Sequence, residues 1–168
     1  MNLIIKDQIP MLRKGYPTVS DKYNVSGGIL AGSSPAKFGE LVKRSGTPGY
    51  FEAITSTVTL ADIVGFVLAT NVKLTEEWPG TTVQVNPGEA FNLMIDGFIA
   101  VELDSNAVVA DIIPNAQLYV TLATGKLTTA TNASAGAVVA LPNCVFTGIY
   151  ENIGTTAAPV YLAEIFVK

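Results

Sequence analysis

Turn residues interrupt the chain at short intervals from Thr81 to Lys168, and this spacing constrains the fold more than any other feature. The runs between them are rich in β-branched and aromatic residues, with turns roughly 8–12 residues apart, as in β-sandwiches and barrels. The sequence predicts strands over residues 81–85, 90–95, 98–103, 107–113, 117–122, 126–129, 137–141, 144–150 and 160–167. We therefore expect an all-β domain, a compact sandwich or barrel of jelly-roll type.

Two of the turns carry specific signatures. The tetrapeptide Asn86–Glu89 reads Asn-Pro-Gly-Glu. This order suits a type II turn, because proline presets φ at the second position and glycine accepts a positive φ at the third. Asp96-Gly97 lies between two short apolar runs and is typical of the type I′ turn of a hairpin. We expect residues 90–95 and 98–103 to form a hairpin with Asp96-Gly97 at its tip.

The first third of the chain has weaker signals. Residues 50–59 and 63–69 predict two further strands, and Ser34 could cap one or two helical turns over residues 35–44. Residues 1–34 show little periodicity and predict an extended, irregular arm. We divide the chain into an N-terminal arm and lead-in segment (residues 1–45) and a β domain (residues 46–168). On this division, the β body should fold even without residues 1–28.

Composition excludes several kinds of chemistry. The chain has no histidine, which removes Ser-His-Asp triads, Cys-His dyads and histidine metal sites. Cys144 is the only cysteine, so the chain can form neither an internal disulfide nor an all-cysteine metal site. With no basic neighbour in sequence, Cys144 is interpreted as a small buried hydrophobe. We expect a noncatalytic protein with no cofactor and no metal.

The low charge predicts association. Charged residues make up 14% of the chain, against about 25% in an ordinary soluble domain. The hydrophobic set makes up 49%, so a free monomer would expose much neutral and apolar surface. We expect the protein to hide that surface against copies of itself or against a partner. The longest apolar stretch, Leu60–Ala69, is about half the length of a membrane helix of roughly 20 residues, so no membrane is expected as partner.

The N-terminal arm is both basic and apolar. Residues 1–44 hold seven basic and three acidic residues, a net charge of +4, whereas the remainder carries −8. The acidic body argues against nucleic acid, because it would repel phosphate. A partner's surface would offset the entropy lost when such an arm becomes ordered. The candidate contacts of the arm with a partner or another subunit are Ile4, Ile5, Ile9, Met11, Leu12, Arg13, Lys14, Tyr16 and Tyr23, and the candidate exposed loop contact is Trp78.

The order of several short motifs resembles the cement, or decoration, proteins of tailed-bacteriophage capsids. These motifs are Gly15-Tyr16-Pro17, Phe38-Gly39, residues 63–69, the run from Pro87 to Val101, Leu118-Tyr119-Val120 and the closing Ala163-Glu164-Ile165. Two features depart from the family pattern: Thr18 stands where the family often has glycine, and residues 71–85 form a longer stretch than usual.

The resemblance implies a noncatalytic protein on the exterior of the virion capsid, present in the host cytoplasm during assembly. It would bind the assembled head and bridge neighbouring subunits of the major capsid protein. Self-association is expected, with a trimer favoured because capsid lattices have local threefold points and a dimer as the other state. Two other readings stay open: a head-fibre or tail-associated β module of the virion, and a carbohydrate-binding β-sandwich with Trp78 or tyrosines stacked on sugar.

Overall fold

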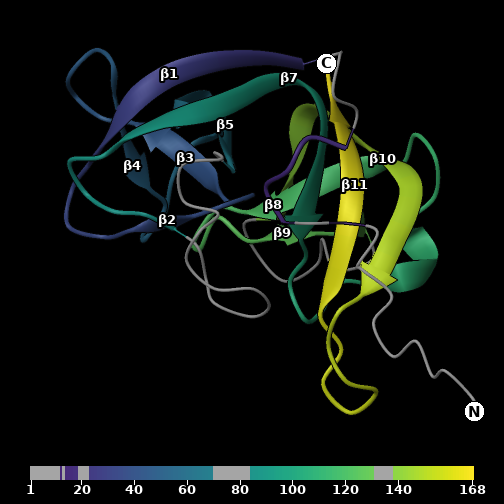
Figure 1. Cartoon of the computed structure of the whole chain (residues 1–168). Coiled ribbons are helices and arrows are strands. Elements are labelled where there is room, and N and C mark those ends of the chain that lie inside the picture. The colour runs from purple at the N-terminus through teal and green to yellow at the C-terminus, as the bar shows by residue number, and fades with distance from the viewer. Residues whose placement is uncertain (1–11, 13, 19–22, 70–83, 131–137) are drawn as a thin grey trace, which may run out of the picture.

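Strands make up most of the computed structural model, which describes residues 12, 14–18, 23–69, 84–130 and 138–168 (Figure 1). The predicted all-β class is confirmed, and the strands close into a barrel. The strands are β1 (Tyr23–Ala31), β2 (Ala36–Lys37), β3 (Leu41–Arg44), β4 (Tyr50–Ala53), β5 (Ile63–Leu68), β6 (Gln84–Val85), β7 (Ala90–Glu102), β8 (Gln117–Thr121), β9 (Leu127–Thr128), β10 (Val138–Asn152) and β11 (Tyr161–Val167). Two short 3₁₀ turns, η1 (Leu60–Asp62) and η3 (Val109–Asp111), are the helical elements among these residues.

The first half of the fold is a ring of five strands. Its order is β1-β4-β3-β5-β7, and β1 pairs again with β7, which closes the ring. The pairing of β1 with β4 is parallel and the others are antiparallel. Buried side chains from its strands form one cluster, with members on β1, β3, β5 and β7: Leu30, Val42, Val67, Phe91 and Leu93. In Figure 1 this half lies to the left, with β1 and β7 curving side by side along the top.

The second half continues from the same β7. Strands follow in the order β7-β11-β10-β8-β9, all antiparallel. A bridge between Leu103, just after β7, and Leu127 of β9 joins the two ends of this series. Most of the larger hydrophobic cluster lies in this half, including Val101, Phe146 and Ile165. β7 is therefore a structural member of both halves.

The wall formed by β3, β5 and β7 has a hydrophobic core on each face. Phe66 and Met94 point into the larger cluster, whereas Val67 and Leu93, next to them in sequence, point into the smaller one. Strands buried on both faces are continuously apolar rather than alternating. This explains the unbroken apolar run over residues 63–69, which the sequence correctly assigned to a strand and which forms β5.

The predicted hairpin at Asp96-Gly97 is wrong. β7 runs without interruption through both residues, and its two ends pair with different neighbours, β1 and β5 on one side of the bend and β11 on the other. Gly97 has φ of 124°, and the β1–β7 register shifts between Asn24 and Val25, so that Ile95 is skipped. A β-bulge at Ile95 therefore lies two residues before this glycine, and a bulge bends a strand and increases its twist. The bulge directs β7 from the first half into the second.

Several other predicted boundaries also change. Residues 107–113 form the η3 turn and not a strand, and residues 35–44 form β2 and β3 and not a helical turn. Pro142-Asn143 does not end a strand, because β10 continues through it with a register shift between Ala140 and Val145. The strands predicted over residues 117–122 and 160–167 are confirmed as β8 and β11.

The described part of the predicted arm packs on its own domain. β1 lies inside residues 1–34 and pairs with β7 and β4. Pro17 bridges Ile99 of β7, and the backbone N–H of Thr18 donates to the carbonyl of Phe98 at 3.1 Å. The prediction of an irregular arm over residues 1–34 is therefore wrong for the residues described, because they include β1 and pack on β7. The sequence of β1 does not show the alternation typical of a strand, because position 28 is a glycine. The ring of Phe51 occupies the space beside Gly28, and a Cβ there would overlap that ring.

Candidate interaction surfaces

The N-terminal segment is anchored on the outer face of β7 and β11. Leu12 is buried with Ala100 and Leu162 in a small cluster separate from the two larger ones. The backbone N–H of Leu12 donates to Oε2 of Glu151, on β10, at 3.1 Å. The backbone N–H of Gly15 donates to the carbonyl of Ala100 at 2.7 Å. Leu12 is therefore held both on the face of β7 and β11 and by a side chain of β10.

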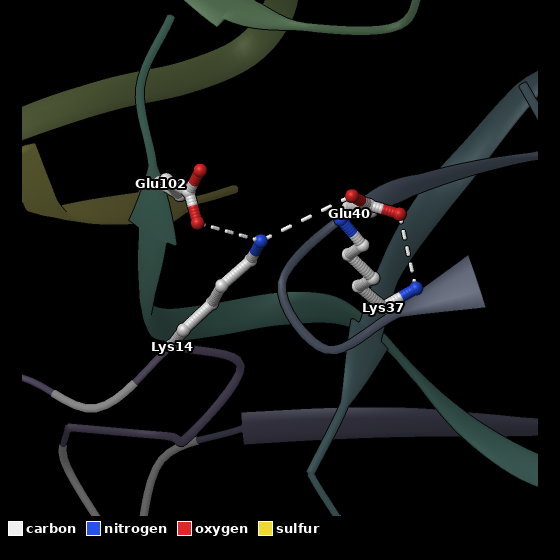
Figure 2. Close-up of polar contacts among 4 residues, drawn as sticks. All are labelled: Lys14, Lys37, Glu40 and Glu102. Carbon is white, nitrogen blue, oxygen red and sulfur yellow. Dashed lines mark hydrogen bonds and ion pairs between the residues drawn. The ribbon is translucent and has the colours of Figure 1, made fainter. Parts of the chain in front are cut away.

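Lys14 connects this segment to both halves of the fold. Its Nζ lies 2.9 Å from Oε2 of Glu102, at the end of β7, and 3.9 Å from Oε1 of Glu40, just before β3. Figure 2 shows the ammonium between the two carboxylates, while the second oxygen of Glu40 accepts the backbone N–H of Lys37 at 2.9 Å. Ion pairs as exposed as these contribute at most about 1 kcal/mol each. They fix the position of the segment more than they stabilise the fold.

A cavity of about 340 Å³ opens next to this ion pair, between the two halves. Its charged lining residues balance, with three lysines and three acids: Lys14, Lys37, Lys126, Glu40, Glu102 and Asp104. This mixture favours neither an anion nor a cation. Among the described residues, no three histidine, cysteine or acidic side chains come together as metal ligands.

Cys144 is buried, as the sequence predicts. Desolvation raises the pKa of its thiol from 9.0 to about 12, so the group is protonated at neutral pH. The thiolate is the nucleophilic form of cysteine. Cys144 is thus a packing residue.

The most apolar exposed surface lies along the end of β10. The side chains of Ile149, Tyr150 and Ile153 are 43%, 43% and 47% exposed, and Ile113 beside them is 57% exposed. Pro114, which follows Ile113, lies against Gly148 of β10. Sequence periodicity placed residues 144–150 in a strand, but it carried no signal that the end of this strand would lack a neighbouring strand on one side. We call residues 149–153 together with Ile113 the β10 rim.

A comparison with protein-family models identifies the family to which the chain belongs. The model of the structural cement protein (E217 gp24/Pam3 gp6) matches residues 7–167. The chain belongs to this family of phage cement proteins. Its role is therefore that of a structural phage protein, and the family resemblance seen in the sequence is confirmed.

A solved structure has the same fold. One chain from the capsid of Myoviridae phage XM1 superposes with a TM-score of 0.59 at 20% sequence identity, covering 90% of this cement protein and 88% of that chain. No curated protein matches. Among the described residues, no helix has the length and apolar character needed to span a membrane.

The predicted contact residues of this cement protein fall into two groups. Leu12 and Lys14 are held by their own chain, Tyr16 is half-buried beside β7, and Tyr23 begins β1. The others lie outside the described residues: Ile4, Ile5, Ile9, Met11, Arg13 and Trp78.

Proposed function

We propose that this cement protein binds the exterior of the assembled phage head and bridges neighbouring subunits of the major capsid protein, without catalysis. The family match over residues 7–167 is the observation that carries this proposal. The chemistry of the chain is consistent with it, since the protein has no histidine and its one thiol is protonated and buried. The protein would assemble in the host cytoplasm and remain on the virion.

The proposed capsid contact is the part of the arm that precedes the anchor at Leu12. Residues 1–11 carry Ile4, Ile5, Ile9 and Met11, which are too apolar for a purely solvated tail. Eleven residues can span at most roughly 40 Å, enough to reach an adjacent subunit. Arg13 and the loop around Trp78 are proposed as further contacts. Several such weak contacts, joined in an oligomer, gain avidity because later ones become intramolecular.

Binding to heads that lack the protein tests this function. Full-length protein added to such heads should cosediment with them at a fixed ratio to the major capsid protein and should raise their resistance to heat. Replacing Ile4, Ile5 and Ile9 with serine should weaken binding by at least about tenfold, the equivalent of roughly 1.4 kcal/mol.

The matched control for the arm variant is serine at Val25 and Ile95, two exposed apolar residues of the first half. This variant should bind as the unaltered protein does. Failure of the full-length protein to bind heads would reject the cement function. Full-strength binding by the arm variant would instead reject the arm as the contact.

A further inference from the structure

We propose that the β10 rim is the surface through which a second copy of this chain binds, giving a two-fold dimer by antiparallel pairing of the two β10 edges. This inference deepens the self-association expected of the cement protein by naming its surface. It also selects the dimer over the trimer, because two identical edges that pair with each other are related by a two-fold axis.

The end of β10 has a free edge. On one side, β10 pairs with β11 up to Asn152. On the other side it pairs with β8 only as far as Val145, after which Phe146 exchanges two backbone hydrogen bonds of 2.8 Å with residues 115 and 116. Pro114, which lies against Gly148, has no N–H with which to continue this pairing. From residue 149 onward, the described part of the chain places no strand on this side of β10.

Such an edge is normally protected. Proteins guard exposed strand edges with lysine, proline, bulges or a covering segment, since unpaired N–H and C=O groups are a template for another strand. The β10 rim does contain an irregularity, since the β10–β11 register shifts between Phe146 and Tyr150, and Asn152 is an exposed polar residue. The other exposed side chains of the rim are apolar. Four of the seven large hydrophobic side chains that the described residues expose belong to it: Ile113, Ile149, Tyr150 and Ile153. An apolar strand edge fits a partner that supplies a strand and an apolar face of its own.

Charge identifies that partner as a second copy. Residues 127–163 contain a single charged residue, Glu151, and residues 112–125 contain none. The carboxylate of Glu151 already accepts the N–H of Leu12. Two copies of a chain with a net charge of −4 repel each other over most of their surfaces, but not through this neutral region. A basic or acidic capsid surface would find almost no opposite charge here to recognise.

Charge insertion at the rim is the direct test. Replacing both Ile149 and Ile153 with lysine should raise the dimer dissociation constant at least about tenfold, because the interface would bury unpaired charges. The matched control places lysine at Val25 and Ile95, which are 46% and 41% exposed on the other half of the fold. Sedimentation velocity of the free protein at micromolar concentration should give a dimer for the unaltered and control proteins and a monomer for the rim variant.

Cross-linking covers the case in which the rim variant does not fold. Ile153→Cys should yield a disulfide-linked dimer on mild oxidation, whereas Val25→Cys should not, and the buried Cys144 does not compete. A monomeric or trimeric unaltered protein, a rim variant that remains dimeric, or equal cross-linking at both positions would overturn the proposal. Because no heads are present, none of these outcomes bears on capsid binding, which the head assay tests separately.

Discussion

Gly65 shows how closely two strands approach in the wall between the two cores. A Cβ added there would lie 2.5 Å from the carbonyl oxygen of Met94, a backbone atom of β7. A flexible side chain could move away from such a contact, but a strand held by neighbours on both sides cannot do so freely. The identity of this residue is therefore set by packing between β5 and β7.

Alanine substitutions at two glycines test this point. Gly65→Ala should lower the free energy of unfolding by about 1–3 kcal/mol through overpacking. Gly27→Ala is the control, because a Cβ at Gly27 has no atom within 4 Å. It should be neutral or raise the free energy of unfolding by up to about 1 kcal/mol, since alanine reduces the entropy of the unfolded chain. Urea denaturation measures both, and equal effects would contradict the proposed crowding.

Cys144 should make stability fall in alkaline solution. In the unfolded chain the thiol ionises near its ordinary pKa of 9.0, whereas in the folded protein it keeps its proton up to about 12. Above pH 9 the unfolded state therefore binds fewer protons than the native state, and the free energy of unfolding falls by about 1.4 kcal/mol per pH unit. Below pH 9 both states are protonated, and the contribution is constant.

The Cys144→Ala variant isolates this effect. Its free energy of unfolding is lower at neutral pH because packing is lost, but it lacks the thiol's titration. The difference between the unaltered protein and the variant should be constant from pH 7 to 8 and should shrink between about pH 9.5 and 10.5. Parallel stability curves over the whole range would show that the thiol is not desolvated.

At the scale of elements, β1 decides which N-terminal truncations the fold tolerates. Removal of residues 1–11 leaves Leu12 on Ala100 and Leu162 and leaves β1 intact. Removal of residues 1–28 takes away the anchor and the pairing of β1 with β7 from Tyr23 to Gly28, which opens the first ring. The expectation from sequence that the body folds without residues 1–28 is revised accordingly.

Thermal unfolding compares the two truncations. The shorter one should keep the β-type circular dichroism spectrum and a melting temperature within about 5 °C of the full chain, because a shift of that size corresponds to roughly 1–2 kcal/mol. The longer one should lose the cooperative transition. A folded, cooperative protein without residues 1–28 would show that β1 is dispensable to the ring.

At the scale of the whole molecule, the two halves share a strand and a wall. β7 runs through both, and the larger cluster includes Leu41, Phe66 and Leu68 from the first half. Neither half can lose its structure without exposing apolar surface of the other. The fold is therefore expected to behave as one cooperative unit, although it is built from two rings.

Calorimetry tests this cooperativity. Heating should give a single transition whose calorimetric enthalpy equals its van't Hoff enthalpy, in a variant that is monomeric so that dissociation does not contribute. Two resolved transitions would mean that the halves unfold separately and that β7 does not couple them.

Two glycine-containing motifs, Asn86–Glu89 and Asp96-Gly97, show where sequence reasoning succeeds and where it fails. Asn86–Glu89 forms the predicted turn: Gly88 has φ of 88°, and the N–H of Glu89 donates to the carbonyl of Asn86 at 3.0 Å. Every group in that turn comes from four consecutive residues. The positive φ of Gly97 was also expected, but the position of this glycine inside a continuous strand was not. Whether it closes a hairpin or bends a strand depends on β1, β5 and β11, which are far away in sequence.

The sequence by itself determined the all-β class, the family, the packing role of Cys144 and the strands β5, β8 and β11. These follow from local turn chemistry, from the apolar pattern and from the absence of histidine. The tertiary structure alone decided that β1 belongs to the ring, that β7 serves two halves and that the end of β10 is a free apolar edge. The physical reason is that strand pairing joins residues distant in the chain, and an edge is defined by the neighbour that a strand lacks.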